Sequence, residues 1–425
     1  MTYRRSAVGR QGARILDMLD VTAVRNQFPS LSQLQNGKPV VYLDNPGGTQ
    51  VPQRVIDAMV HYLQQDNSNH GGAFPTSRRS DAMLEQAHQA MADMLGAASR
   101  NEIVFGLNMT TLTMGLSRAL SHWVKPGDEL IVTRLDHDAN ISPWMLLARD
   151  AGASLRWVDF HPEDCSLDLD DLERQLSKKT KIVACGLASN AVGTINDVER
   201  IARMAHAYGA LVFVDAVHYA PHGPIDVQAL DCDFLVCSAY KFFGPHVGVL
   251  YGKHDLLDRL PAYKVRPADP RPPHKFETGT QNHEGIAGTL AAVEYLASLS
   301  GDRGTRRDQV LSSMALLRDY ERDLMAHLIG GLRQIQGLRI YGITDTNRFD
   351  RRVPTVAFRI EGLAPRRVAE LLGERGLFVW DGNYYAPAVT ERLGMEQTGG
   401  MVRVGLVHYN TMEEVDRLIA ALHQL

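Results

Sequence analysis

Short apolar segments alternate with amphipathic segments from about residue 80 onward, and this alternation restricts the possible fold more than any other feature. Apolar strands are expected at residues 102–106, 128–133, 181–188, 211–216 and 233–239, with helices between them. Strands separated by helices favour an α/β architecture with a largely parallel sheet, because each helix returns the chain to the same end of the sheet. The segment VGVLYG (247–252) follows a tight Gly-Pro turn and is expected to join that sheet in the antiparallel direction.

A second pattern begins near residue 290, where long helices are followed by strands such as LRIYG and MVRVGLV. This mixture predicts a smaller α+β domain. We therefore expect residues 40–290 to form a large α/β domain, and residues 1–39 together with 291–425 to form a small α+β domain. The Pro-rich segment 264–276 is incompatible with regular structure and is interpreted as a lid or a partner-contacting arm.

Charge and cysteine usage narrow the class of protein. The net charge is only −4, which gives no reason to expect nucleic acid or an acidic membrane as a partner. No apolar run reaches membrane-spanning length, and the first 20 residues contain no signal-peptide core, so a cytoplasmic protein is expected. The four cysteines form no C-x-x-C pair and no cluster with zinc spacing, so no metal site is predicted.

The stretch SAYKFFGP places Lys241 between aromatic residues at the end of an expected strand, and Asp215 ends the preceding one. Ligands of open α/β sheets bind at the carboxyl ends of the strands. A salt bridge is the simpler interpretation of this pair. The alternative is a pyridoxal phosphate site, in which the lysine forms a Schiff base and the aspartate holds the pyridine nitrogen protonated.

Other strand ends carry groups that suit the same cofactor. Thr110 and Thr111 open an expected helix, where backbone N–H groups favour a phosphate, although a threonine at the start of a helix is usually only an N-cap. His137 has a flat ring that can stack on a pyridine, and Asn190 can reach the ring hydroxyl. The residues expected to bind the cofactor from this side of the sheet are Met109, Thr110, Thr111, His137, Asn190, Asp215, His218, Ser238, Tyr240 and Lys241.

With these residues identified, the chain resembles the class V, fold-type-I pyridoxal-phosphate enzymes, and among them the cysteine desulfurase and selenocysteine lyase group. The matching stretches include YLDNPGG, LASNAVGTIN, VFVDAVHYAPH, SAYKFFGPHVGVLYG and KFETGTQNHEGIAG, in the order of the family. The resemblance implies that Lys241, Asp215 and His137 are catalytic. It also implies that Arg403 clamps the substrate α-carboxylate, and that Thr280 reaches the phosphate of a neighbouring subunit in a homodimer.

One stretch departs from the desulfurase pattern. In VWDGNYYAP (379–387), Tyr385 stands where the resemblance implies a persulfide-forming cysteine, and Trp380 stands where it implies an arginine. A tyrosine cannot replace a thiolate nucleophile. Tyr384, Tyr385 and Trp380 are therefore expected to shape an apolar or aromatic substrate pocket, with a proton-donor role for Tyr385 as an alternative to plain packing.

These observations lead to one main functional hypothesis. The protein is expected to act on an amino acid as a C–S lyase, by a β-elimination that gives pyruvate and ammonia without a persulfide cysteine. A class V aminotransferase or amino-acid epimerase is the alternative, and a non-catalytic pyridoxal-phosphate-binding protein is a third hypothesis.

Overall fold

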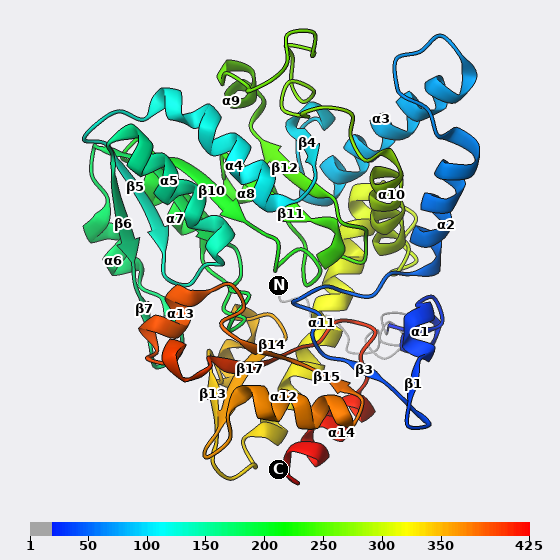
Figure 1. Cartoon of the computed structure of the whole chain (residues 1–425), viewed down its shortest axis with the longest axis vertical. Helices are drawn as coiled ribbons and strands as arrows, with labels where there is room; N and C mark the ends of the chain where they lie inside the picture. The colour runs from blue at the N-terminus through cyan, green and yellow to red at the C-terminus, as the bar shows by residue number, and fades with distance from the viewer. Residues whose placement is uncertain (1–18) are drawn as a thin grey trace, which may run out of the picture.

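The computed structural model describes residues 19–425, and a seven-stranded sheet lies in its upper half as drawn (Figure 1). The strand order is β4-β12-β11-β10-β9-β5-β6. The bounds are β4 (Ile103–Gly106), β5 (Glu129–Thr133), β6 (Ser154–Val158), β9 (Thr180–Gly186), β10 (Leu211–Asp215), β11 (Phe234–Ser238) and β12 (Gly248–Gly252). Strand β12 is antiparallel to both of its neighbours, and the other pairings are parallel. The predicted α/β fold with a mostly parallel sheet is confirmed, and so is the direction of VGVLYG.

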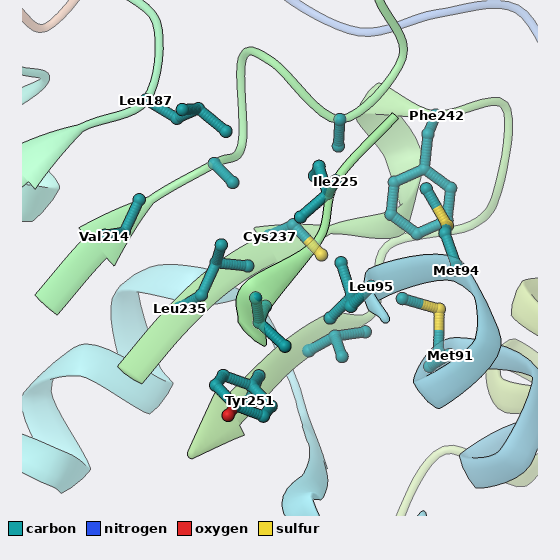
Figure 2. Close-up of a cluster of buried hydrophobic side chains, with 14 of the residues drawn as sticks. Met91, Met94, Leu95, Leu187, Val214, Ile225, Leu235, Cys237, Phe242 and Tyr251 are labelled. Atoms are coloured by element: carbon teal, nitrogen blue, oxygen red, sulfur yellow. The ribbon is translucent and has the colours of Figure 1, made fainter. Parts of the chain in front are cut away.

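Both faces of this sheet are buried, which explains why its strands are continuous apolar runs rather than alternating ones. In β5, Leu130 and Val132 pack in one hydrophobic cluster with helices α4 and α5, whereas Ile131 packs in a second cluster with helices α3, α7 and α10. Figure 2 shows part of the second cluster, where Met91 and Met94 of α3 face Cys237 of β11. These helices are α3 (Pro75–Leu95), α4 (Met109–Leu120), α5 (Ser142–Ala151), α7 (Val198–His206) and α10 (His283–Ala297).

A four-stranded antiparallel sheet lies below the larger one in Figure 1, in the order β13-β14-β17-β16. Its strands are β13 (Leu338–Tyr341), β14 (Thr355–Ile360), β16 (Trp380–Gly382) and β17 (Met401–Gly405). Its core includes residues of α11 (Arg306–Leu332), α12 (Pro365–Glu374) and α14 (Met412–Leu422). The helix between β16 and β17 is α13 (Pro387–Arg392). The expected α+β mixture is therefore observed, while the domain boundaries stay a prediction.

The segment LFVW, expected as one strand, is split between two sheets. Strand β15 (Leu377–Phe378) pairs in parallel with β3 (Val41–Tyr42), whereas Trp380 begins β16 and pairs with β17. Because β3 pairs with β15, the residues just after β3 lie beside β17, and Asp44 forms a single β-bridge with Gly405. Two distant parts of the sequence thus meet beside the large sheet.

The remaining α-helices and strands are short, apart from one nine-residue helix. They are α1 (Val21–Arg25), α2 (Gln53–His61), α6 (Leu169–Gln175), α8 (Val227–Leu230), α9 (His254–Arg259), β1 (Leu34–Gln35), β2 (Lys38–Pro39), β7 (Phe160–His161) and β8 (Ser166–Leu167). Helix α3 begins at Pro75, because proline is accommodated in the first helical turn. Residues 264–276 contain no helix or strand, as expected. Within residues 19–425, no helix combines the length and apolar character needed to cross a membrane.

Candidate active site

A cavity of about 590 Å³ lies at the carboxyl ends of the large sheet and is closed by residues of the smaller sheet. It brings together most of the residues singled out from the sequence. Those lining it are Met109, Thr110, His137, Asn190, Asp215, His218, Ser238, Tyr240, Lys241, Trp380, Tyr384, Tyr385 and Arg403. The residues expected at the strand ends therefore lie together around one cavity, while their roles stay predictions.

Lys241 is at the end of a 3₁₀ turn that follows β11, with its amine inside the cavity. Nζ donates hydrogen bonds to the carbonyl oxygens of Pro46 and Gly47, the latter at 3.0 Å, and lies 4.7 Å from the centre of the Tyr240 ring. Burial lowers the pKa of Lys241 to about 7, and the nearby positive charge of Arg403 adds to this effect. A substantial fraction of the amine is therefore neutral at physiological pH, as a nucleophile or a base requires.

Asp215 ends β10 at the neighbouring position of the sheet. Its Oδ1 accepts a hydrogen bond of 2.8 Å from the backbone amide of Val217, which fixes the carboxyl group at the strand end. Burial raises the pKa of Asp215 to about 6. A cation bound beside Asp215 would offset the energetic cost of burying a charge and favour the ionised carboxylate. The position thus suits the partner of a protonated ring nitrogen.

His137 is held as a neutral imidazole. Its Nδ1 accepts a hydrogen bond of 3.0 Å from the backbone amide of Ala139, which leaves the proton on Nε2. Burial lowers the pKa of His137 to about 4, and the charge of Lys241 acts in the same direction. The ring of Tyr385 stacks on it with centroids 5.7 Å apart and an interplanar angle of 11°.

The two tyrosines of VWDGNYYAP form a turn at the cavity mouth. Tyr384 and Tyr385 have φ angles of 58° and 57°, a region that bulky residues rarely adopt. Two hydrogen bonds hold the turn against the cavity wall. Asn190 Nδ2 donates to the carbonyl of Tyr384 at 2.9 Å, and the amide of Asp138 donates to the carbonyl of Tyr385 at 2.7 Å. Backbone strain maintained in this way is typical of functional sites.

Arg403, from the middle of β17, enters the same cavity from the opposite side. Nη1 donates to the carbonyl of Asn190 at 3.0 Å, and Nη2 lies 2.9 Å from a carboxylate oxygen of Asp44. The guanidinium lies over the ring of Tyr384, 4.5 Å from its centre. Nε is buried and has no hydrogen-bond partner among residues 19–425, so the guanidinium retains a donor for a bound anion.

The N-terminus of helix α4 forms another part of the wall. The backbone amide of Met109 donates to Ser238 Oγ at 3.1 Å, which connects this helix end to the strand that precedes Lys241. Thr110 lines the cavity, whereas Thr111 bonds Asn108 in a capping box and is exposed to solvent. Thr280 is also exposed and outside the cavity. The cofactor roles of Thr111 and Thr280 stay predictions.

Sequence reasoning missed several cavity residues, and the acidic ones among them are Asp44, Asp136 and Asp138. Asp136 accepts a hydrogen bond of 2.6 Å from Thr133 Oγ1, and burial raises its pKa to about 7. The motif DHD offered a signal for Asp136, because it directly precedes His137. The stretch YLDNPGG drew attention to the region of Asp44 but not to its place beside Arg403, which depends on a contact across most of the chain.

All four cysteines are buried in the core, and none lines the cavity. Figure 2 shows the sulfur of Cys237 among apolar side chains. Burial raises the pKa of every one of the four thiols, and that of Cys165 reaches about 12. Within residues 19–425, no group of histidine, cysteine and acidic side chains is arranged to hold a metal ion.

The donor set fits pyridoxal phosphate. A lysine of lowered pKa is available for an aldehyde, and a buried carboxylate is available for a pyridinium. The N-terminus of α4, with Thr110 and Ser238, offers donors to a phosphate. Two buried polar atoms on the wall, Nε2 of His218 and Oδ1 of Asn190, have no partner in the described part of the chain. Such atoms are expected where a polar ligand completes the site.

Fold and site together define an α/β protein whose strand-end cavity has residues that suit a lysine-bound cofactor. Comparison with known families agrees, because residues 41–418 match the family described as aminotransferase class-V. The chain belongs to this family and is a cysteine desulfurase-like member of it. Membership in the family implies dependence on pyridoxal phosphate.

Several individual relatives of the chain are named cysteine desulfurases or probable cysteine desulfurases. The chain is 36% identical to a cysteine desulfurase of Synechococcus elongatus, covering 96% of this chain and 64% of the relative. It is 34% identical to a probable cysteine desulfurase of Streptomyces coelicolor, covering 96% and 97% respectively. Among solved structures, an apo cysteine desulfurase from Thermococcus onnurineus superposes with a TM-score of 0.85 at 26% identity, over 100% of this chain and 99% of the other. The cysteine desulfurase CsdA of Escherichia coli gives a TM-score of 0.82 at 28% identity, over 96% and 98%.

Proposed function

We propose that the protein is a carbon–sulfur lyase, which cleaves a cysteine-derived amino acid by β-elimination to a thiol, pyruvate and ammonia. The observation that carries this proposal is the pair of tyrosines at the cavity mouth, combined with the burial of all four thiols elsewhere. A desulfurase that passes sulfur to its own cysteine needs a thiolate beside the substrate. The names of the relatives support a sulfur-containing substrate, while this site lacks the means to form a persulfide on the chain.

Arg403 and Lys241 would bind and activate the substrate. The free N–H groups of the Arg403 guanidinium bind the α-carboxylate, and this places the α-carbon toward Lys241. Pyridoxal phosphate, when bound, supplies an electron sink for the bond that breaks at the α-carbon. His137 and Asp215 are fixed in the cavity wall by hydrogen bonds from backbone amides, so that the cofactor would be held without rearrangement.

Proton transfer completes the reaction. The neutral amine of Lys241 takes the α-proton as a general base. The electron pair left at the α-carbon expels the sulfur group, which departs with the electrons of the C–S bond and takes up one proton. The remaining unsaturated amine is released and hydrolyses to pyruvate and ammonia. No oxidant or reductant is required.

Trp380 and Tyr385 are exposed at the cavity mouth and would contact the sulfur substituent. Their aromatic surfaces favour an apolar or aromatic substituent. The proposal also includes a homodimer in which Thr280, exposed on its own chain, reaches the phosphate held by the partner. This arrangement accounts for the distance of Thr280 from the cavity of its own chain.

Product analysis tests the reaction type. The purified protein, loaded with pyridoxal phosphate, is incubated with L-cysteine and with S-benzyl- and S-alkyl-L-cysteines, and Lys241→Ala serves as the control. Pyruvate, ammonia and free thiol in equal amounts, without alanine, are expected from the wild type only. Alanine would instead indicate a desulfurase that uses an external thiol. A D-amino acid or a 2-oxo acid that retains sulfur would indicate the epimerase or aminotransferase alternative.

A further inference from the structure

A buried arginine outside the cavity lining connects backbone segments of both sheets. Arg352 lies shortly before β14, and its exposed fraction is 4%. Its guanidinium donates four hydrogen bonds, and all of them go to backbone carbonyls. The acceptors are Thr355 at 2.5 Å, Val192 at 3.3 Å, Val353 at 3.5 Å, and Ile343. One side chain therefore joins the start of β14, the loop after β13 and a turn that follows β9 of the large sheet.

The guanidinium of Arg352 is a buried cation whose hydrogen bonds, within residues 19–425, include none to a carboxylate. Burial lowers its pKa to about 10, so the group stays charged at physiological pH. A buried charge opposes folding unless other groups compensate it. Convergent carbonyl oxygens provide such compensation only while the segments that carry them keep their relative positions. The arrangement therefore fixes the backbone around Arg352.

The turn held by Arg352 consists of residues 188–195, and an antiparallel bridge closes it. It includes Val192, the residue whose carbonyl accepts from Arg352. It also includes Asn190, whose carbonyl accepts the 3.0 Å hydrogen bond from Nη1 of Arg403. The position of the 188–195 turn thus determines where one of the two polar partners of the Arg403 guanidinium lies.

The 188–195 turn packs closely against the small sheet. The amide of Val353 donates to the carbonyl of Gly193 at 2.9 Å. Gly193 has a φ angle of 81°, and a Cβ atom there would lie 2.5 Å from the carbonyl oxygen of Thr355, which Arg352 also binds. Thr355 begins β14, and β14 pairs with β17, the strand that carries Arg403. The turn is therefore fastened to the same sheet from which Arg403 projects.

We propose that Arg352 is a positioning residue, which locks the 188–195 turn onto the small sheet and so orients Arg403 for the substrate carboxylate. The carbonyl of Asn190 transmits this constraint to the guanidinium of Arg403. Preorganisation of this kind strengthens binding because the binding group does not have to be ordered by the ligand. The inference rests on the proposed role of Arg403 in substrate binding, and it is independent of the reaction that follows.

Binding of a carboxylate that cannot react tests the role of Arg352. The probe is 3-(benzylthio)propionate, which has the carboxylate and thioether of the proposed substrates but no amine, and calorimetry gives its Kd for the holoenzyme. Arg352→Met removes all four hydrogen bonds and is expected to raise Kd about tenfold or more, because displaced binding groups lose that much. Arg352→Lys keeps a cation and a donor, so a smaller increase, about threefold, is expected.

Arg333→Met is the matched control. Arg333 is exposed, and its Nη2 donates to the carbonyl of Thr344 at 2.6 Å, one residue after a carbonyl that Arg352 binds. This substitution also removes an arginine–carbonyl bond from the loop after β13, but its Kd for the probe is expected to equal that of the wild type.

Two readouts separate positioning from a general loss of stability. In the Arg403→Ala background, adding Arg352→Met should leave Kd unchanged, because both residues act through one contact. With S-benzyl-L-cysteine as substrate, Arg352→Met should raise KM while kcat changes by less than about threefold. A further increase of Kd in the double variant would show that Arg352 acts elsewhere, and this would overturn the proposal.

Hydrogen exchange in the wild-type holoenzyme covers the case in which Arg352→Met does not fold. The probe is expected to slow the exchange of the 188–195 amides together with those of β17, since the two segments are held as a unit. Protection of β17 alone would overturn the proposal, and so would a wild-type Kd in Arg352→Met. Failure of the wild type to bind the probe would overturn it together with the proposed role of Arg403. None of these outcomes depends on which products form, so they are distinct from a failure of the lyase proposal.

Discussion

The carboxylate of Asp44 lies 2.9 Å from Nη2 of Arg403, and 359 positions separate the two residues in the sequence. The arginine proposed to bind a substrate carboxylate therefore already contacts a carboxylate of the chain itself. The Asp44 side chain is more exposed than that of Arg403, at 23% against 4%, and both line the cavity. A substrate that uses this guanidinium must share it with Asp44.

Substitutions at the two residues are expected to act in opposite directions on substrate binding. Arg403→Ala should raise KM for α-carboxylate substrates by roughly two to four orders of magnitude, because a charged bidentate contact is lost. Asp44→Asn should lower KM by about threefold to tenfold, because a competing anion is removed while the side chain keeps its shape. Steady-state kinetics with an S-alkyl-L-cysteine provide both values. A higher KM in Asp44→Asn would show that Asp44 orients the arginine rather than competing for it.

The lowered pKa of Lys241 predicts how fast the apoprotein takes up pyridoxal phosphate as pH changes. Only the neutral amine attacks the aldehyde, so the rate should rise about tenfold per pH unit below pH 7 and level off above it. The plateau should move to higher pH in Arg403→Ala, which removes a neighbouring cation, and to lower pH in Asp44→Asn, which removes an anion. Stopped-flow absorbance gives the rates. A rate that keeps rising to about pH 10 would indicate an ordinary, solvated lysine.

Thiol reagents should leave the activity unchanged. All four cysteines are buried, and their raised pKa values keep them protonated. Treating the native holoenzyme with iodoacetamide at pH 7.5 should alter the rate of pyruvate formation by less than about twofold, since the thiolate is the reactive form. Mass spectrometry of the treated protein is the control for labelling. Inactivation that follows the labelling of one cysteine would contradict the proposed mechanism.

The ring of Tyr384, rather than its hydroxyl, is expected to support the substrate binding proposed for Arg403. The guanidinium lies 4.5 Å from the centre of this ring, and the hydroxyl is buried without a partner in the described residues. Tyr384→Phe should therefore keep KM within about twofold, whereas Tyr384→Leu should raise it roughly fivefold to thirtyfold, because a desolvated cation–π contact is worth about 1–2 kcal/mol. A large loss of activity in Tyr384→Phe would instead assign the phenol to proton transfer.

Much of the site could be predicted because it depends on local rules. In a parallel sheet the carboxyl ends of the strands meet, so residues such as Asp215, Lys241 and Asn190 had to converge once their strands were recognised. The antiparallel β12 followed from its tight turn. These inferences need only the segment around each residue.

What could not be predicted depends on contacts between distant segments. Asp44 reaches Arg403 because β3 pairs with β15, and nothing in the sequence near residue 44 indicates that pairing. The split of LFVW has the same origin, since its two halves pair with strands of different sheets. The sequence also did not show that the hydroxyl of Thr111 bonds Asn108 in a capping box, and the cofactor role of Thr111 stays a prediction. Whether a threonine in the first helical turn caps the helix or binds a phosphate depends on which way that turn faces in the folded protein.

The separation between the two sheets along the chain has a consequence for biosynthesis. The large sheet, with Lys241, Asp215 and His137 at its strand ends, is complete in sequence at Gly252, whereas Arg403 belongs to the last strand of the smaller sheet. About 150 residues are synthesised between these points, which takes about 8 to 30 seconds at roughly 5–20 residues per second. The groups that suit the cofactor therefore leave the ribosome well before the arginine proposed to hold a substrate, so a nascent chain is expected to be able to capture its cofactor before any amino acid can react with it.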